Sequence, residues 1–380
     1  MPSNLKARLG RIRQSVGGET GGLPAAAPAT AGPGEYSWPG WRQAGFHTLK
    51  RELSRELSFP VPAAFPRALA ALVPDFARAG RLPAPEELLF FDLETTGLST
   101  GAGTVAFLAA SGRFADSGGP SPRVAITQYL LLDYPGEADF VRNVAAEFSP
   151  QTPDAPPFVV SYNGKSFDSP ILNTRCLMSG IKPPAYAHAD LLHPARRLWR
   201  KELTDCSQAT VEASVLGLDR RGDLPGALAP DIWFSFLRSG GNGELLLVCD
   251  HNARDITGLA SLLLGLAEIA SAPLESRSRF RVSEADLALS WRSALKKTPL
   301  FFGSEEQTSG ELLLQAAARS GCPHAAIALA KTAEWQQGNP ALALAYTDRA
   351  LQEAALSAAL RQGLEKRRAR LLGKIARLPS

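Results

Sequence analysis

The stretch that decides the fold reads LLFFDLETTG over residues 88–97. A short apolar run bounded by turn residues predicts a buried strand over Leu88 to Leu93. Because successive side chains of a strand point to opposite faces, Asp92 and Glu94 lie on the same face. Acidic residues are rare in strands and in cores. Two of them at the end of an apolar strand therefore indicate a site that attracts a cation.

Similar patterns follow on the C-terminal side of this strand. Apolar runs predict strands over residues 104–114, 123–132 and 158–161, and a short strand that ends near Asp190. Helical patterns predict helices over residues 137–148 and 166–179, and further helices up to residue 270. This alternation predicts an α/β domain over residues 86–270.

The flanking segments have different compositions. Residues 1–40 are rich in Gly, Pro and Ala, which predicts a flexible N-terminal segment and linker. Residues 41–85 contain helix-like pieces broken by prolines, so we expect a helical preface to the domain. Residues 282–378 are rich in Ala and Leu, which predicts a separate all-α region.

The overall composition narrows the possible classes. The chain has 380 residues, 45% hydrophobic and 21% charged, which is typical of a globular protein with two or three folded units. Because the net charge is only +4, any affinity for nucleic acid must come from local basic patches. The four cysteines form no CxxC pair, which argues against zinc ribbons and disulfide frameworks. We expect a cytoplasmic protein without a membrane segment, because no run of about 18 apolar residues occurs.

Two further acids, Asp168 and Asp255, occur where the chain can return to the same edge of the sheet. Asp168 closes NGKSFD (163–168), directly after the predicted strand 158–161, and Asp255 closes HNARD (251–255). In open sheets, functional groups collect at the carboxyl ends of the strands and in the loops that follow. Clustered carboxylates suit hard divalent cations such as Mg²⁺ or Mn²⁺.

In this order, the motifs FDLETTGL, YNGKSFD and HNARD resemble those of the DEDD (DnaQ-like) exonuclease superfamily of the ribonuclease-H-like fold. ETTGLSTGAGTVAF, DLLHPARRLW and TVEASVLGLDRRGDLPG make the chain most similar to the YprB-like ribonuclease-H-like proteins. The resemblance covers about residues 85 to 270. It implies a mixed sheet flanked by helices, and a nuclease that acts on DNA or RNA, most readily as a 3′–5′ exonuclease. It also implies that two metal ions, Mg²⁺ or Mn²⁺, are held by four carboxylates: Asp92, Glu94, Asp168 and Asp255.

His251 departs from the pattern of that superfamily, which has a tyrosine four residues before the last acid or a histidine five residues before it. Here the histidine stands four residues before Asp255, and residues i and i+4 share one face of a helix. His251 is therefore a candidate catalytic base, or a residue that orients the attacking water. The alternative is a structural histidine at a helix start. Asp190 is a candidate for holding the metal-binding carboxylates in position without binding the metal itself.

Candidate substrate-binding residues come from two places. Thr95 and Asn163 belong to the motifs that carry the acids, and Lys165 can neutralise a substrate phosphate, although a solvated lysine is an equal alternative. Arg196 and Arg197 form a basic run beside Trp199 that can follow a phosphate backbone.

Two further arginines and a tryptophan belong to the same candidate surface. Arg220 and Arg221 are candidates for extending it. Trp199 can stack on a base, but the pattern slightly favours a core residue of an amphipathic helix.

The C-terminal region resembles a tetratricopeptide repeat around Gly338-Asn339, Ala343 and Ala350, although Glu334 and Thr347 stand where bulky apolar residues are usual. We expect this region to position substrate or to bind a protein partner. The alternative to a nuclease is a nucleic-acid-binding scaffold that does not cleave, whose helices recruit a partner.

Overall fold

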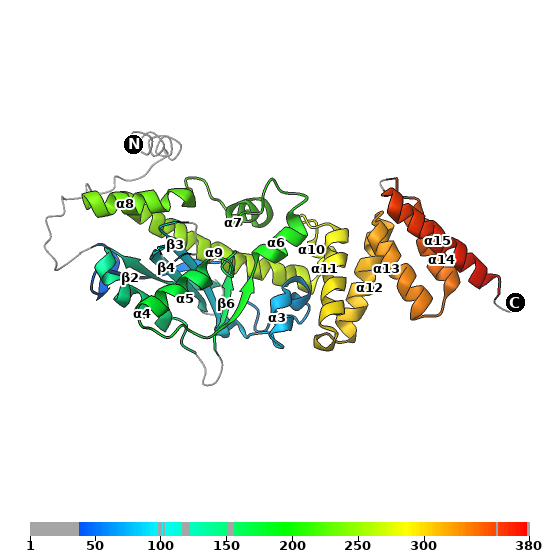
Figure 1. The fold of residues 1–380 in the computed structure, drawn as a ribbon, viewed down its shortest axis with the longest axis horizontal. Helices are drawn as coiled ribbons and strands as arrows, with labels where there is room; N and C mark the ends of the chain where they lie inside the picture. The colour runs from blue at the N-terminus through cyan, green and yellow to red at the C-terminus, as the bar shows by residue number, and fades with distance from the viewer. Residues whose placement is uncertain are drawn as a thin grey trace. The chain divides into compact units, whose positions relative to one another are not determined.

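The structure is a computed structural model that describes residues 38–97, 101, 103–115, 122–150, 156–354 and 356–377. The predicted flexible segment 1–40 therefore lies outside the described residues, apart from residues 38–40. Within the described ranges, seven strands form one sheet in the order β1-β2-β5-β4-β3-β6-β7 (Figure 1). They are β1 (Trp41–Gly45), β2 (Thr48–Glu56), β3 (Leu88–Thr95), β4 (Ala106–Ala115), β5 (Arg123–Leu131), β6 (Phe158–Ser161) and β7 (Ala187–Asp190).

The sheet is mixed. Strands β1, β2, β5, β4 and β3 pair antiparallel, and β3, β6 and β7 pair parallel. The predicted strands over 88–93, 104–114, 123–132 and 158–161 are confirmed, because apolar runs between turn residues are buried as strands here. The predicted α/β class, a mixed sheet flanked by helices with a C-terminal helical region, is confirmed.

Helices cover both faces of the sheet (Figure 1). On one face, Leu89, Phe91 and Leu93 of β3 share a buried cluster with α4 (Glu137–Ala146) and α5 (Asp168–Met178). On the other face lies α9 (Gly243–Ser271). The chain has glycine at position 112 of β4 where Ile256 of α9 approaches, because a Cβ there would lie 2.4 Å from Ile256 Cγ2.

The prediction of a helical preface over residues 41–85 was wrong for its first part. Residues 41–56 form β1 and β2, and β2 pairs with β5 along its whole length, from Thr48 opposite Leu131 to Glu56 opposite Arg123. Lys, Arg, Glu and Leu dominate this stretch and favour helix locally, but the long-range pairing with β5 overrides that propensity. Short helices appear only later, as α2 (Leu69–Leu72) and α3 (Pro74–Arg78).

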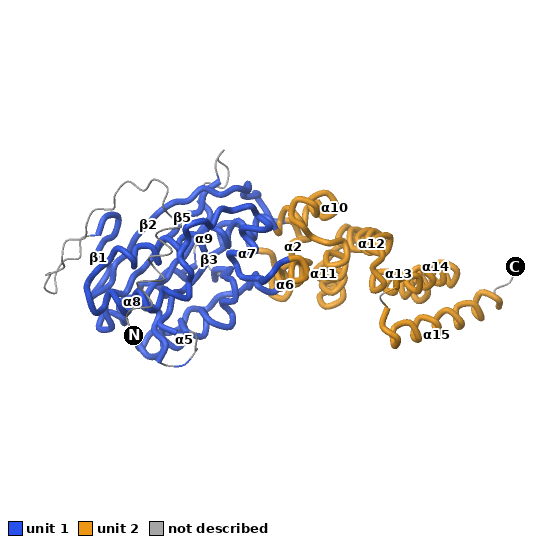
Figure 2. The backbone as a smooth tube through the Cα atoms, turned by 90° about the horizontal axis from the view of Figure 1, so that it is seen from above, with its two compact units in different colours: residues 1–65, 83–193, 203–265 blue, residues 66–82, 194–202, 266–380 orange. Residues whose placement is uncertain are grey.

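The chain divides into two compact units, coloured separately in Figure 2. The first comprises residues 1–65, 83–193 and 203–265, and the second residues 66–82, 194–202 and 266–380. The helices not yet located are α6 (Leu192–Trp199), α7 (Gln208–Val211), α8 (Ala229–Ser239), α10 (Pro273–Ser276), α11 (Glu284–Lys297), α12 (Ser304–Arg319), α13 (Pro323–Trp335), α14 (Pro340–Leu351) and α15 (Ala358–Ile375).

From α11 to α15, each helix of the second unit packs on the next. The chain turns between two of these helices at Gly338-Asn339-Pro340: α13 ends at Trp335, Gly338 has a φ of 61°, and the Asn339 side chain caps α14. Glu334, which departs from the tetratricopeptide pattern, is buried and paired with basic residues of α15. The tetratricopeptide resemblance stays a prediction.

Candidate active site

The orientation of Asp92 follows from a row of polar side chains across the sheet. Asp92 of β3, Ala110 of β4 and Gln128 of β5 lie in register on the face that α9 covers. Asn252 of α9 donates to Asp92 Oδ2 at 2.7 Å and accepts from Gln128 Nε2 at 2.9 Å. Gln128 and Asn252 are fully buried. The sequence reasoning missed both residues, because only the sheet register brings them next to Asp92.

Asp168 reaches the site through a tightly held loop. The backbone N–H groups of Asn163 and Lys165 donate to the Asp190 carboxylate at 2.7 and 3.2 Å, and Asn163 has a φ of 67°. Gly164 must be glycine, because a Cβ there would lie 2.4 Å from Ser161 Oγ and 2.8 Å from Asp168 Oδ2. The loop thus delivers Asp168 to the start of α5, where its Oδ1 accepts the Leu93 N–H at 3.1 Å.

His251 and Asp255 lie one turn apart in the middle of α9, so His251 does not stand at a helix start. Its Nε2 lies 3.3 Å from Asp255 Oδ2, as the i, i+4 spacing predicts. One ligand atom each from Glu94, His251 and Asp255 lie within 4.8 Å of one another, which is close enough for a shared metal ion. Asp92 and Asp168 do not belong to this group of three in the structure.

Arg220 is the main difference from the sequence-based interpretation, which assigned it to a basic surface run. Its side chain is 10% exposed and pairs at 2.6 Å with each of three carboxylates, those of Glu212, Asp223 and Asp255. Gly258 of α9 makes room for this arrangement, because a Cβ there would lie 1.7 Å from Glu212 Oε1. Arg221, in contrast, is exposed and pairs with Asp219.

Asp223 is a further residue that the sequence reasoning did not single out. Its Oδ1 lies 3.0 Å from His251 Nδ1. Burial opposes its ionisation, but the contacts with His251 and Arg220 lower its pKa to about 2. For His251, burial disfavours the charged form, yet Asp223 and Asp255 raise its pKa above the ordinary value. The sequence signal for Asp223 was its place beside two arginines in LDRRGD.

The remaining acids repel one another. Burial, followed by the charges of neighbouring carboxylates, raises the pKa of Asp92 and of Glu94 well above the usual range. Burial also raises the pKa of Asp168 to about 7, although the Leu93 N–H opposes this shift. Among the described residues, no lysine or arginine pairs with any of these three. This part of the site therefore lacks the positive charge that its carboxylates need.

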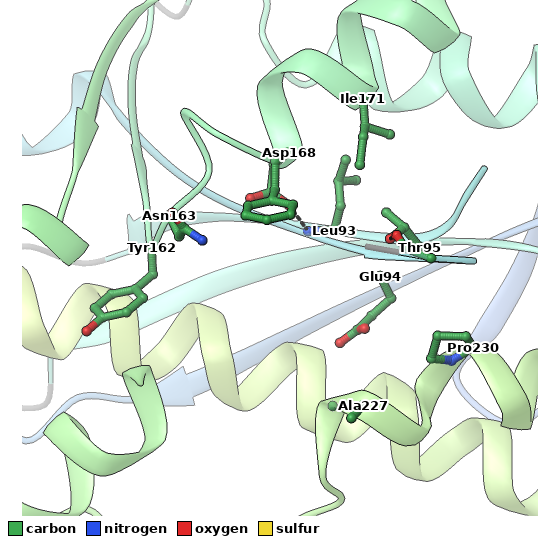
Figure 3. Close-up of a pocket in the computed structure, with 12 residues that line it drawn as sticks. Leu93, Glu94, Thr95, Tyr162, Asn163, Asp168, Ile171, Ala227 and Pro230 are labelled. Carbon is green, nitrogen blue, oxygen red and sulfur yellow. Dashed lines mark hydrogen bonds between the residues drawn. The ribbon is translucent and has the colours of Figure 1, made fainter. Parts of the chain in front are cut away.

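A cavity of about 420 Å³ opens beside these acids (Figure 3). The Glu94 side chain points toward the segment that carries Ala227 and Pro230, and Asp168 reaches the strand through its hydrogen bond to Leu93. Two of the predicted substrate-binding residues, Thr95 and Asn163, line this cavity. Most of its other lining is apolar or aromatic, contributed by Leu93, Tyr162, Phe167, Ile171, Ala227 and Pro230. An organic ring and a charged group could therefore both be held there.

The predicted basic run lies in the second unit. Arg197 donates to the Leu72 carbonyl oxygen at 2.6 Å, and burial lowers its pKa. Arg196 is exposed. Trp199 is fully buried and donates its ring N–H to the Phe280 carbonyl oxygen at 2.8 Å, so the core interpretation was correct for this residue.

Comparison with known proteins gives a family for the first unit's sheet domain. Residues 89–266 match the family model described as the RNase_H superfamily. The chain is 36% identical over 214 residues to the uncharacterized protein YprB of Bacillus subtilis, a match that covers 56% of this chain and 49% of that protein. The chain thus spans about half of that relative's length.

Among solved structures, the family B DNA polymerase from the hyperthermophilic archaeon Pyrobaculum calidifontis matches with a TM-score of 0.35 and 14% identity, over 56% of this chain and 29% of the polymerase. In the described part of the chain, every helix is too short or too polar to span a bilayer. Residues 89–266 form a domain of the ribonuclease H superfamily.

Proposed function

We propose that this chain is a metal-dependent nuclease that hydrolyses phosphodiester bonds of DNA or RNA as a 3′–5′ exonuclease with two Mg²⁺ or Mn²⁺ ions. The observation that carries the proposal is a group of three carboxylates without a cationic partner among the described residues: Asp168 is buried, and Asp92 and Glu94 are half-buried. A group of this kind is costly unless it binds a cation.

The donor set fits such ions. Carboxylate oxygens are the ligands that Mg²⁺ and Mn²⁺ prefer. Asp92, Glu94, Asp168 and Asp255 would hold the ions. When bound, a pair of such ions stabilises the attacking and the leaving oxygens of an in-line displacement at phosphorus. Asn252 keeps the Asp92 carboxylate in one orientation through its 2.7 Å hydrogen bond.

We assign His251 the role of proton acceptor for the attacking water. Contacts at both ring nitrogens support this role, because Asp223 near Nδ1 stabilises the imidazolium that forms when Nε2 takes up a proton. Arg220 fixes Asp223 and Asp255 at the same time. The histidine is therefore oriented by residues that do not themselves accept the proton.

The cavity provides a place for the terminal nucleotide. Phe167 and Tyr162 offer aromatic surface for a base, and Thr95 and Asn163 offer polar groups for the sugar and phosphate. Lys165, whose N–H is bound by Asp190, belongs to the loop beside the cavity.

The test is a panel of single- and double-stranded DNA and RNA, each labelled at one end and incubated with Mg²⁺, with Mn²⁺ or with EDTA. We expect shortening from the 3′ end that depends on the metal. Cleavage at internal positions would contradict the exonuclease assignment and would show that the chain is an endonuclease. Binding without cleavage of any substrate would contradict the nuclease and favour a non-cleaving scaffold.

A further inference from the structure

The second unit carries a groove that the proposed nuclease site does not use. It has a volume of about 610 Å³ and is formed by α11, α12 and α13. Each helix contributes residues spaced three and four apart, such as Arg292, Leu295 and Lys296 of α11, so one face of each helix points into the groove. Gly310 lets α12 approach α11 closely, because a Cβ there would lie 2.8 Å from Leu295 Cδ1.

The charge of the groove is unbalanced. Arg292, Lys296 and Lys331 line it, against a single acid, Glu311. None of the three cations has an ion-pair partner among the described residues. Other basic residues of the same unit are paired, as Arg277 is with Glu284 at 3.2 Å. Cations left unpaired in a concave surface attract an anionic ligand.

An aromatic ring stands at the edge of these charges. Trp335 also lines the groove, and it is 66% exposed. Lys374 Nζ and the Arg370 guanidinium lie 4.6 and 5.4 Å from the centre of its ring, and both side chains are held by Glu334. Contact with these held cations favours one orientation of the ring. A large exposed aromatic ring beside free cations is the combination that single-stranded nucleic acids require, because their unpaired bases stack and their phosphates pair with lysine and arginine.

We infer that this groove binds a single strand of DNA or RNA, with phosphates on Arg292, Lys296 and Lys331 and a base stacked on Trp335. An acidic peptide would satisfy the cations, but it would leave the indole ring without a partner. The inference goes beyond the proposed cleavage and does not depend on it.

The experiment measures binding of the full chain to a fluorescein-labelled oligothymidine of about 12 nucleotides, a length within the usual range for one binding module. EDTA is present, so no metal-dependent cleavage occurs. The double variant Lys296→Gln/Lys331→Gln should bind more weakly. Its plot of log affinity against log salt should be shallower by about 1.4, because each lost phosphate contact on a single strand removes about 0.7. The control is Lys297→Gln/Arg319→Gln, which removes the same charge from exposed residues outside the groove and should keep the wild-type slope.

Trp335 gives a second measurement. The other five tryptophans of the chain are at most 8% exposed, so quenching of tryptophan fluorescence by the oligonucleotide reports on Trp335. Trp335→Ala should abolish that quenching and weaken binding about 5- to 150-fold, the effect of losing one stacked base. Leu312→Ala, which removes another exposed apolar side chain, should do neither.

Two results would overturn the inference. One is an unchanged salt slope in the groove variant together with unchanged affinity in Trp335→Ala, with all variants folded by circular dichroism. The other is quenching of Trp335 by a polyglutamate peptide but not by the oligonucleotide, which would make the groove a peptide site. Neither result bears on the nuclease, since cleavage is not measured.

Discussion

Both units hold acidic side chains away from solvent, but only in the second unit do basic side chains neutralise the acid compared here. Glu334 of the second unit has a side chain only 1% exposed, and three basic side chains surround it, those of Arg367, Arg370 and Lys374. Burial opposes its ionisation, but these partners lower its pKa below the ordinary value. In the first unit, Asp92 and Glu94 are half-buried beside other carboxylates, and their pKa values are raised.

This difference separates a structural acid from a functional one. Glu334 links α13 to α15, because basic side chains of α15 neutralise its charge. No described lysine or arginine neutralises the acids at the end of β3, so they ionise together only against mutual repulsion, which a bound cation would relieve. Arg220 is the exception within the first unit, since it compensates Asp255 but none of the other three carboxylates proposed as metal ligands.

The largest expected effect on stability follows from replacing Arg220. Arg220→Met removes the cation that Glu212, Asp223 and Asp255 share and leaves the buried Glu212 without an ion-pair partner among the described residues, so it should lower the free energy of unfolding of the first unit by about 3–5 kcal/mol. Chemical denaturation measures this loss. Arg221→Met, an exposed neighbour paired only with Asp219, is the matched control and should keep the stability of the wild type. Equal stability of both variants would mean that Arg220 does not hold the site together.

His251→Ala should slow cleavage about 100-fold or more while leaving nucleic-acid binding within a few-fold of wild type. Because Asp223 and Asp255 raise the pKa of His251, the imidazole is protonated at low pH and can accept a proton only above that pKa. The wild-type rate should therefore rise with pH through a midpoint above about 6.5. A pH–rate profile of the variant that keeps this rise would assign it to another group and return His251 to a structural role.

Glu334→Gln should destabilise the second unit by about 2 kcal/mol, less than a fully buried pair, because Arg370 and Lys374 are themselves more than 40% exposed. The loss arises from cations that no longer have an acid between them. Thermal unfolding followed by circular dichroism detects it. Unchanged stability would show that the three cations are satisfied by water, and the contrast between the units would weaken.

The smallest effect is a pH dependence with opposite sign in the two units. The folded chain binds a proton at Asp168 up to about pH 7, whereas the unfolded carboxyl releases it near its ordinary pKa of 3.8. Between these values the folded state holds more protons, so its stability in EDTA falls as the pH rises.

Asp168→Asn should therefore unfold at a temperature a few degrees above wild type at about pH 8, and the two should converge near pH 4. Added Mg²⁺ or Mn²⁺ should stabilise wild type more than this variant. For Glu334, whose pKa is lowered, the contribution to stability is instead lost as the pH falls. A variant without any gain at high pH would show that the carboxylates of the first unit are not under mutual repulsion.

The sequence predicts those parts of the fold whose signals are local. Apolar runs between turns locate β3 to β6, and the order of the acidic motifs selects Asp92, Glu94, Asp168 and Asp255. The strands β1 and β2 escaped prediction because their residues favour helix until β5 pairs with them. The tetratricopeptide pattern marked Glu334 as anomalous, but its reason, the basic residues of α15, lies more than 30 residues away along the chain.

The site shows the same limit. Arg220 appears in the sequence as one of two adjacent arginines, and nothing local distinguishes the buried one from the exposed one. Asn252 and Gln128 are polar residues without a motif, and they meet Asp92 only through the register of three strands and one helix. Partners that neutralise or orient a catalytic candidate come from distant segments, so the sequence identifies the acids better than their surroundings.

The most direct test of the contrast compares the single-turnover cleavage rates of Asp92→Asn and Glu334→Gln with Mg²⁺ and an end-labelled oligonucleotide, at a temperature where both variants are folded. Each variant removes one carboxylate charge at nearly constant shape. We predict that Asp92→Asn loses at least about 100-fold in rate, because a metal ligand is lost, and that Glu334→Gln stays within a few-fold of wild type. Equal rates in the two variants would contradict the claim that the uncompensated acids at the end of β3 carry the activity.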